Sequence, residues 1–280
     1  MKILLITDQH FGVRNDNQVF IEKYQEFYSE TVLPFIDKNK IEHVICLGDV
    51  FDKRKSINFL SLDAARKMWF DPLRDRGITM DTLIGNHDIY YKNTLKVNAL
   101  DHLLGEYENI NVINDAQHLE YDGLKILMLP WICDDNKKEI DDIVENTDAT
   151  VCFGHLELSG FEAVPGRIME HGEDPTRYEK FDLVCSGHYH MKSRIGNVNY
   201  LGNPYQLYWN DYGQKRGFHV LNTNNKKITF YPNPYHIFNK LWYDDVNNDY
   251  TEIPDFKKLK GSYVKPVSYT HLTLPTNREV

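Results

Sequence analysis

The chain has 280 residues, of which 41% are hydrophobic and 26% charged, and its net charge at pH 7 is −9. This composition is typical of a globular protein, and no apolar run approaches the roughly 20 residues that span a bilayer. The negative charge argues against a broad basic face that binds nucleic acid unaided, but it does not exclude a nucleic-acid substrate, because bound divalent cations would offset carboxylates locally.

The first 190 residues alternate short apolar runs with amphipathic segments, which predicts a sheet covered by helices on both faces. Helices are predicted at residues 19–37 and 59–74 from apolar residues at three- and four-residue steps, and Pro34 can kink or shorten the first of them. Strands are predicted at residues 2–7, 43–47, 80–84, 125–129, 150–153 and 182–186.

Later strands are predicted at residues 198–201, 217–221 and 227–231, where Gly-, Asn- and Lys-rich turns favour antiparallel pairing. An α/β sandwich over residues 1–231 is therefore expected. The sequence changes in character at Pro232, and residues 232–265 are expected to begin a smaller domain that the chain does not finish. Residues 266–280 resemble a translated sequencing adapter and are expected to be a non-native tail.

The cysteines are widely spaced and form no C-x-x-C pair, which favours buried thiols in a reducing compartment. The N-terminus leads directly into an apolar strand and shows no signal-peptide pattern. The cytoplasm is therefore the expected location. The four cysteines are Cys46, Cys133, Cys152 and Cys185.

Five short polar motifs each follow a predicted strand. Because the carboxyl ends of such strands form the crevice of an open α/β sheet, their side chains are expected to gather at one edge. The mixed oxygen and nitrogen donors, without thiolate, suit manganese, iron or zinc, with manganese as the first choice. Each motif alone is a weak signal, since a lone His or Asp is more often only hydrogen-bonded or solvated. The motifs are Asp8-Gln9-His10, Gly48-Asp49, Gly85-Asn86-His87-Asp88, Gly154-His155 and Gly187-His188-Tyr189-His190.

In this order, the motifs resemble those of the calcineurin-like metallophosphoesterase superfamily over residues 1–231. The resemblance implies a four-layer α/β/β/α sandwich and two divalent metal ions that activate a water for attack at phosphorus. One ion would be held by Asp8, His10, Asp49 and His190, and the other by Asp49, Asn86, His155 and His188, with Asp49 bridging.

His87 is next to a ligand and is expected to protonate the leaving oxygen, with Asp88 orienting or charging its imidazole. The alternative for His87 is a packing residue beside the metal ligands. His87 and Asp88 are the two candidate catalytic residues.

Several longer sequence segments around these motifs resemble those of the DNA repair exonuclease branch of the superfamily. This branch is SbcD-like and includes the recombination endonuclease subunit of tailed phages. The resemblance implies a DNA exo/endonuclease of recombination and double-strand-break repair, and an SbcC-like coiled-coil ATPase as partner. A homodimer through residues 59–74 is possible, although these residues could equally face the core. The alternatives are a phosphomonoesterase or nucleotide hydrolase, and a scaffold without activity. The segments are residues 48–55, 84–88, 129–131, 154–160 and 200–204.

Cationic side chains near these motifs are candidates for DNA binding, since a polyanionic backbone would approach the metals there. The alternative is a solvated loop. Many cellular relatives carry a histidine where this chain has Asp52. The candidates are Arg14, Lys53, Arg54, Lys55, Lys92, Lys192 and Arg194.

Overall fold

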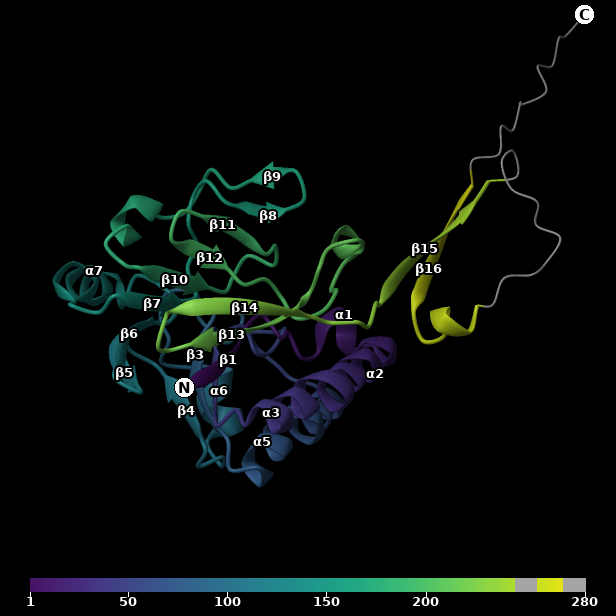
Figure 1. Ribbon diagram of the computed structural model, residues 1–280, viewed down its shortest axis with the longest axis horizontal. Coiled ribbons are helices and arrows are strands. Elements are labelled where there is room, and N and C mark those ends of the chain that lie inside the picture. Colours follow the sequence, from purple (N-terminus) through teal and green to yellow (C-terminus); the bar gives the residue numbers. More distant parts are fainter. Residues whose placement is uncertain (245–255, 269–280) are drawn as a thin grey trace, which may run out of the picture.

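The computed structural model describes residues 1–244 and 256–268, and its main body contains two six-stranded sheets (Figure 1). The first sheet has the order β14-β13-β1-β2-β3-β4, and the second has the order β11-β12-β10-β7-β6-β5. The strands of the first sheet are β1 (Lys2–Ile6), β2 (His43–Cys46), β3 (Thr79–Leu83), β4 (Ile110–Ile113), β13 (Gly217–Asn222) and β14 (Lys227–Pro232). Those of the second are β5 (Gln117–Tyr121), β6 (Leu124–Leu129), β7 (Val151–Gly154), β10 (Leu183–Ser186), β11 (Ser193–Ile195) and β12 (Val198–Tyr200).

Both sheets are mixed. Strands β1 to β4 run parallel, while β13 and β14 complete the first sheet in antiparallel pairs. In the second sheet β6, β7, β10 and β12 run parallel, and the two edge strands β5 and β11 are antiparallel to their neighbours. The antiparallel character expected after residue 198 is thus confirmed for three later strands, but β12 also pairs in parallel with β10.

Alternation of side chains along each strand explains why the sheets stack, because successive residues point to opposite faces. In β1, Ile3 and Leu5 pack between the two sheets, against residues such as Met128 and Phe153. Leu4, in contrast, lies on the helix-covered face. Both faces of this strand are therefore buried, which is why its sequence reads as a continuous apolar run.

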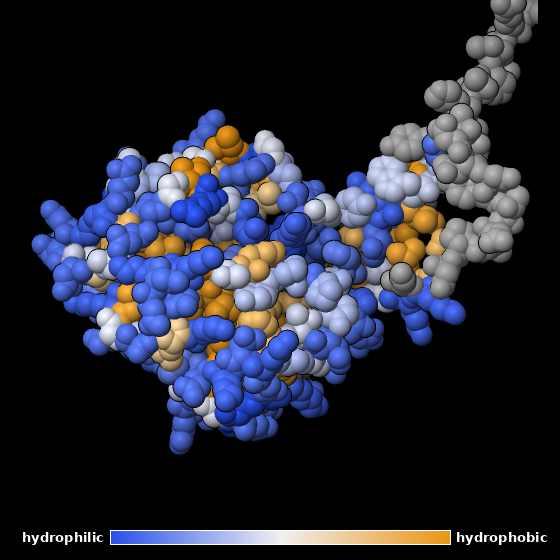
Figure 2. Space-filling model, viewed as in Figure 1, coloured by the Kyte–Doolittle hydropathy of each residue, from blue (hydrophilic) through white to orange (hydrophobic). Residues whose placement is uncertain are grey.

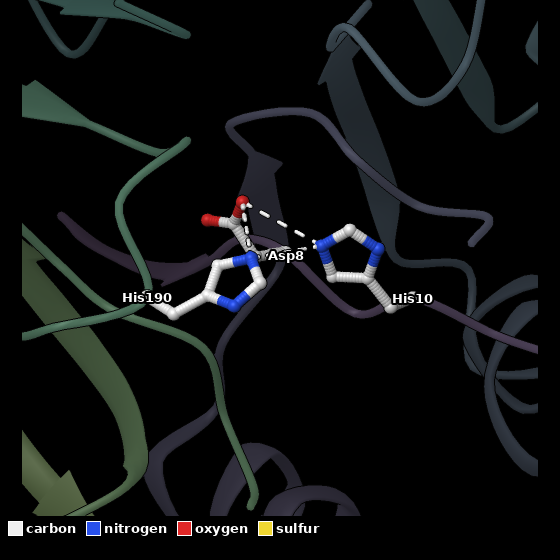
Figure 3. A group of neighbouring side chains, drawn as sticks. All are labelled: Asp8, His10 and His190. Atoms are coloured by element: carbon white, nitrogen blue, oxygen red, sulfur yellow. Dashed lines mark hydrogen bonds and ion pairs between the residues drawn. The ribbon is translucent and has the colours of Figure 1, made fainter. Parts of the chain in front are cut away.

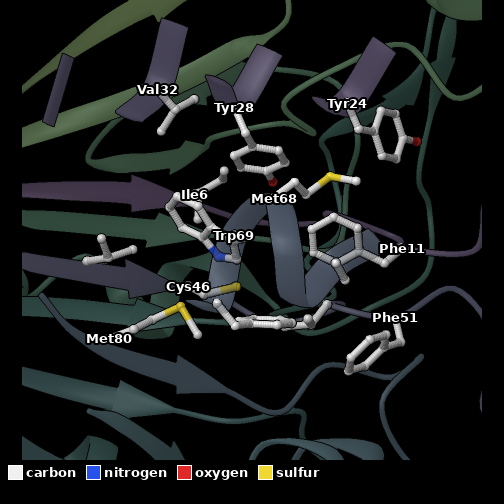
Figure 4. Close-up of a cluster of buried hydrophobic side chains, with 14 of the residues drawn as sticks. Ile6, Phe11, Tyr24, Tyr28, Val32, Cys46, Phe51, Met68, Trp69 and Met80 are labelled. Atoms are coloured by element: carbon white, nitrogen blue, oxygen red, sulfur yellow. The ribbon is translucent and has the colours of Figure 1, made fainter. Parts of the chain in front are cut away.

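Helices cover the outer face of each sheet, which confirms the expected α/β/β/α layering (Figure 1). Figure 4 shows the core beneath the helices of the first sheet, where Trp69 and Tyr28 pack with their ring centroids 4.9 Å apart. The helices are α1 (Val13–Asp16), α2 (Gln18–Phe27), α3 (Leu33–Asn39), α4 (Phe59–Ala65), α5 (Asp71–Asp75), α6 (Ala99–Leu104) and α7 (Lys137–Asn146). Of these, α7 covers the second sheet.

The two predicted helices are continuous through their prolines, because each contains a π-helical turn just before the proline. In the first, the turn η1 (Tyr28–Val32) lets the Leu33 N–H bond to the Tyr28 carbonyl, five residues back. In the second, η2 (Arg66–Phe70) precedes Pro72 in the same way. The wider turn changes the hydrogen-bond register where a proline ring would otherwise meet a carbonyl. Pro34 therefore does not shorten its helix.

Figure 2 shows a mainly hydrophilic face with scattered apolar patches, and all four cysteines are buried as free thiols. No helix among the described residues is long and apolar enough to cross a membrane. Smaller elements are β8 (Glu162–Val164), β9 (Arg167–Ile168), β15 (Phe238–Tyr243) and β16 (Tyr263–Ser268).

The last two strands form a separate parallel pair that projects from the sandwich (Figure 1). Strand β16 includes residues 266–268, which belong to the expected non-native tail, and residues 269–280 of that tail lie outside the described residues. The ring of Phe238, at the start of β15, lies 6.0 Å from that of Phe20 on α2.

Candidate metal centre

The five motifs meet at one edge of the sandwich, as predicted, because each follows the carboxyl end of a strand. Backbone hydrogen bonds tie the loops to one another: Asp8 N–H donates to the Gly48 carbonyl at 3.0 Å and His10 N–H to the Asp49 carbonyl at 3.1 Å. Between the motifs of the second sheet, Gly187 N–H donates to the Gly154 carbonyl at 3.1 Å. Backbone hydrogen bonds therefore join two motif loops in each sheet.

A first group of side chains consists of Asp8, His10 and His190 (Figure 3). Their facing atoms lie close together: Asp8 Oδ1 is 4.0 Å from His10 Nε2 and 3.9 Å from His190 Nε2. The two imidazole nitrogens are 3.1 Å apart. Either a hydrogen on one nitrogen or a cation bound by both accounts for this distance, and the Asp8 carboxylate oxygen that faces both rings favours a cation.

A second group lies beside the first and is built from Asn86, His155 and His188. Asn86 Oδ1 is 3.1 Å from His155 Nε2 and 2.8 Å from His188 Nδ1. Carboxamide oxygen and imidazole nitrogen are donors that divalent transition metals accept. This donor set fits a second ion.

Asp49 lies between the two groups. Its Oδ2 is 3.7 Å from His10 Nε2 and 3.4 Å from His155 Nε2, and its side chain is almost fully buried. One carboxylate oxygen thus faces a histidine from each group. This is the position that a bridging ligand would need.

Hydrogen bonds behind the candidate ligands fix their orientation. The Leu47 carbonyl lies 2.6 Å from His155 Nδ1, so this nitrogen carries the hydrogen and Nε2 is left as an acceptor. Thr7 Oγ1 donates to Asp8 Oδ2 at 2.8 Å, and His188 N–H donates to both Asp8 oxygens. The donor atoms are therefore held before any ion binds.

The charged side chains in this cluster shift one another's pKa values. Burial opposes ionisation of Asp49, but the adjacent His155 and the other histidines outweigh it and hold the pKa of Asp49 well below its usual value. Burial likewise opposes protonation of His155, yet Asp49 raises the pKa of His155 to about 9. Burial, with His10 next in importance, lowers the pKa of His190. The cluster therefore combines an ionised central carboxylate with two different rings: His155 must lose a proton to bind a metal ion, whereas the neutral form of His190 is favoured.

Four of the candidate ligands have backbones in the left-handed region: Asp8 at φ 50°, His10 at φ 44°, Asp49 at φ 53° and His188 at φ 83°. Such conformations cost about 1–3 kcal/mol each for residues other than glycine, and they concentrate at functional sites. The surrounding loops must therefore offset this strain, and the strain supports a functional role for these positions.

Gly85 is predicted to be essential for this geometry. A Cβ at this position would overlap Asp49 at both its side-chain oxygen and its backbone nitrogen. We expect Gly85→Ala to displace Asp49, to reduce metal content measured by plasma mass spectrometry, and to lower the free energy of unfolding by about 1–3 kcal/mol. Gly105→Ala is the control, because its Cβ would lie 2.9 Å from the Asp101 carbonyl oxygen, away from the site. Normal metal content in Gly85→Ala would contradict the prediction.

His87 lies at the edge of the first group, with its ring centroid 4.7 Å from that of His10. Its Nδ1 is 2.6 Å from the Asp52 carbonyl oxygen, and its backbone N–H donates to Asp49 Oδ1 at 2.7 Å. Since a carbonyl only accepts, Nδ1 carries a hydrogen and Nε2 is the ring nitrogen available to a substrate.

The expectation that Asp88 orients His87 is corrected by the structure. The Asp88 carboxylate is fully buried and accepts four backbone N–H groups, those of Asp49 at 2.8 Å, Val50 at 3.0 Å, Phe51 at 3.2 Å and Gly85 at 2.9 Å. Burial, followed by the Asp49 charge, raises the pKa of Asp88 to about 7. Asp88 therefore holds two motif loops together, while the Asp52 carbonyl orients His87.

Three of the predicted DNA-binding cations follow the second motif. Lys53 Nζ lies 3.5 Å from Asp16 Oδ2, and Lys55 Nζ lies 5.1 Å from the centroid of the Tyr90 ring. With Arg54, these side chains line a mainly apolar cavity of about 190 Å³. The cations thus adjoin the metal-site loop and lie beside an aromatic ring.

The other four predicted cations do not lie beside Lys53, Arg54 and Lys55. Arg14 packs on the Tyr208 ring at 4.8 Å, while Lys192 lies 4.4 Å from the Phe230 ring in a different cavity. Arg194 donates to a carbonyl of its own turn and borders that second cavity. The four are Arg14, Lys92, Lys192 and Arg194, and both Lys92 and Arg194 are exposed.

Three residues at the centre were not among the predicted site residues. Asp52 Oδ1 lies 3.5 Å from His10 Nδ1, so the carboxylate at the position of the relatives' histidine contacts a candidate ligand directly. The Trp131 ring centroid lies 5.0 Å from that of His188. Arg216 donates a hydrogen bond to the His190 carbonyl from 26 positions further along the chain. No short motif marks Arg216, so no local signal could have found it.

Comparisons with known proteins show which family this chain resembles. The model of the calcineurin-like phosphoesterase family matches residues 1–192. Exonuclease subunit 1 of Enterobacteria phage T4 is 34% identical over 267 residues, which cover 95% of this chain and 76% of that protein. A phosphoesterase of Invertebrate iridescent virus 3 is 27% identical, covering 74% of this chain and 58% of its own length. A solved archaeal phosphodiesterase has 13% identity and a TM-score of 0.42, covering 83% of this chain and 99% of that one.

Proposed function

Because the chain belongs to the calcineurin-like phosphoesterase family, and is thus a hydrolase of phosphate esters, we propose that it is a two-metal nuclease that cuts DNA. The observation that carries this proposal is the position of Asp49 between two groups of metal-binding side chains. The similarity to a phage exonuclease subunit along 95% of the chain supports DNA as the substrate.

In the proposed centre, the first ion is held by Asp8, His10, Asp49 and His190, and the second by Asp49, Asn86, His155 and His188. The donor set fits divalent ions, and manganese is the first choice for these oxygen and nitrogen ligands. Ions bound there would activate water for in-line attack at phosphorus and neutralise the charge that develops on the phosphate.

The protein side chains supply the remaining steps. His87 donates a proton from Nε2 to the leaving oxygen as the P–O bond breaks, while the Asp52 carbonyl keeps the ring in position through Nδ1. The strained, hydrogen-bonded loops place the ligand atoms in advance, so little reorganisation is needed when the phosphate arrives.

DNA would approach across the loop that follows Asp49. Lys53, Arg54 and Lys55 would contact phosphates there, with Arg14, Lys92, Lys192 and Arg194 as more distant contacts. The Tyr90 ring beside Lys55 offers a surface on which an unpaired base could stack. These cations compensate locally for the chain's net charge of −9.

The proposal extends to the organisation and partners of the protein. Residues 1–231 would form the nuclease domain, and residues 232–265 would begin a capping or DNA-binding domain that includes β15. An SbcC-like ATPase would be the partner, in DNA recombination and repair in the bacterial cytoplasm. A homodimer would use the surface around Phe59 and Leu60, which are 86% and 50% exposed, because most later apolar residues of this helix face the core.

End-labelled linear duplex and single-stranded DNA, incubated with manganese, magnesium or chelator, test this proposal against the alternative of a phosphomonoesterase or nucleotide hydrolase. We expect manganese-dependent shortening of the DNA that chelator abolishes, with much slower turnover of a phosphomonoester reporter. Reporter turnover with intact DNA would favour the small-substrate enzyme instead.

A further inference from the structure

Arg216 lies behind the candidate ligand His190 and is only 4% exposed. Its Nη2 donates to Asp211 Oδ1 at 2.6 Å. Its Nη1 donates to the His190 backbone carbonyl and to Asn203 Oδ1. One guanidinium therefore joins three separate loops, one of which carries a metal-binding side chain.

The carboxylate of this ion pair, on Asp211, is itself held in place by hydrogen bonds. Asp211 Oδ2 accepts the backbone N–H groups of Leu207 at 2.6 Å and Tyr208 at 3.0 Å, and the residue is 4% exposed. Gln206 Nε2 donates to the Asp211 carbonyl at 3.2 Å. The side chain of Gln206 also accepts the Phe238 N–H at 2.8 Å, where β15 begins. The ion pair thus belongs to a buried polar network that continues to the last strands.

A buried ion pair is weak evidence for stability, because the cost of desolvating two charges offsets much of their attraction. Its geometry is more informative. The planar fork of an arginine can hold a carboxylate and a carbonyl at once, whereas a lysine is a point charge that cannot reproduce this arrangement. The contact to the His190 carbonyl restrains the peptide from which the imidazole projects toward Asp8.

We propose that Arg216, held by Asp211, is a positioning residue that fixes His190 for binding of the first metal ion. This inference rests on the proposed metal centre. Arg216 contacts no ligand atom of the second group among the described residues, so its effect falls on one of the two ions. Arg216 acts only through His190 and does not touch the reacting phosphate.

Manganese titration of the whole chain, followed by electron paramagnetic resonance, tests this inference directly through binding. The parent is expected to bind two ions per chain. In Arg216→Lys, the affinity for one ion is expected to fall about 10- to 100-fold, the usual effect of losing a group that orients a metal ligand, while the other ion binds as before. Arg76→Lys is the matched control, because Arg76 binds Asp37 through Nε at 2.9 Å and Nη2 at 3.2 Å on the exposed surface.

Asn203→Ala is a second variant, because it removes one Arg216 contact and leaves the ion pair with Asp211 intact. We expect the same ion to be weakened by a smaller factor, and this variant decides the question if Arg216→Lys does not fold. Unchanged affinity for both ions, or equal weakening of both, in the folded variants overturns the positioning role. A parent chain that binds fewer than two ions overturns the proposed metal centre, and the inference with it.

Discussion

Asp49→Asn is expected to abolish cleavage and to remove both metal ions. Asparagine keeps the volume of the side chain, and its Oδ1 can still accept the His87 N–H that Asp49 accepts at 2.7 Å. The carboxylate oxygen that faces His10 and His155 becomes an amide nitrogen, which cannot ligate a cation. Loss of the ions removes several kcal/mol of transition-state stabilisation, so the rate should fall by at least about three orders of magnitude.

Metal content by plasma mass spectrometry and cleavage of labelled DNA measure the two effects of Asp49→Asn together. Asp81→Asn is the matched control, because Asp81 lies on β3, beside β2 in the first sheet, and its Oδ2 accepts a hydrogen bond at 2.6 Å from Tyr121 Oη on β5 of the second sheet. No candidate ligand contacts Asp81 among the described residues. Retention of two ions per chain by Asp49→Asn would contradict the bridging role.

His87→Ala is expected to lower the cleavage rate by about two to four orders of magnitude, the usual loss when a general acid is removed. Metal content should remain at two ions per chain, because His87 is outside both proposed ligand sets. Its ring is held by the Asp52 carbonyl at 2.6 Å, so truncation removes the proton donor without breaking a bond between ligands. Single-turnover cleavage with saturating manganese isolates this chemical step.

His118→Ala is the control, because it also removes a partly buried, hydrogen-bonded histidine. His118 lies on the edge strand β5 of the second sheet, and its Nε2 is 2.6 Å from Thr147 Oγ1. This variant should cut DNA at the parental rate. Loss of a metal ion from His87→Ala would place His87 among the ligands instead. An unchanged cleavage rate would support a packing role for this histidine.

The sandwich and its polar edge could be predicted because both depend on local sequence. Asp8, Asn86 and His155 each follow a short apolar strand, and the carboxyl ends of neighbouring strands necessarily meet. The same logic located most strands of the two sheets to within one or two residues. Edge strands such as β4 and β11 were missed because they are short and only partly buried, which leaves a weak periodic signal.

The supporting residues could not be predicted because their partners are distant along the chain. Asp88 follows His87 directly, yet its carboxylate binds backbone amides nearly 40 positions away, at Asp49 and Val50. Arg216 reaches His190 across a gap of 26 positions. A charged residue beside a motif has the same local signal whether it orients a ring or holds a loop, and only the folded chain distinguishes these roles.

The central claim is that two ions share Asp49, and anomalous diffraction from crystals soaked in manganese tests it most directly. We predict two peaks about 3.5–4 Å apart. One would contact Asp8, His10 and His190, the other would contact Asn86, His155 and His188, and the Asp49 carboxylate would lie between them. A single peak, or two peaks without a shared carboxylate, would contradict this account.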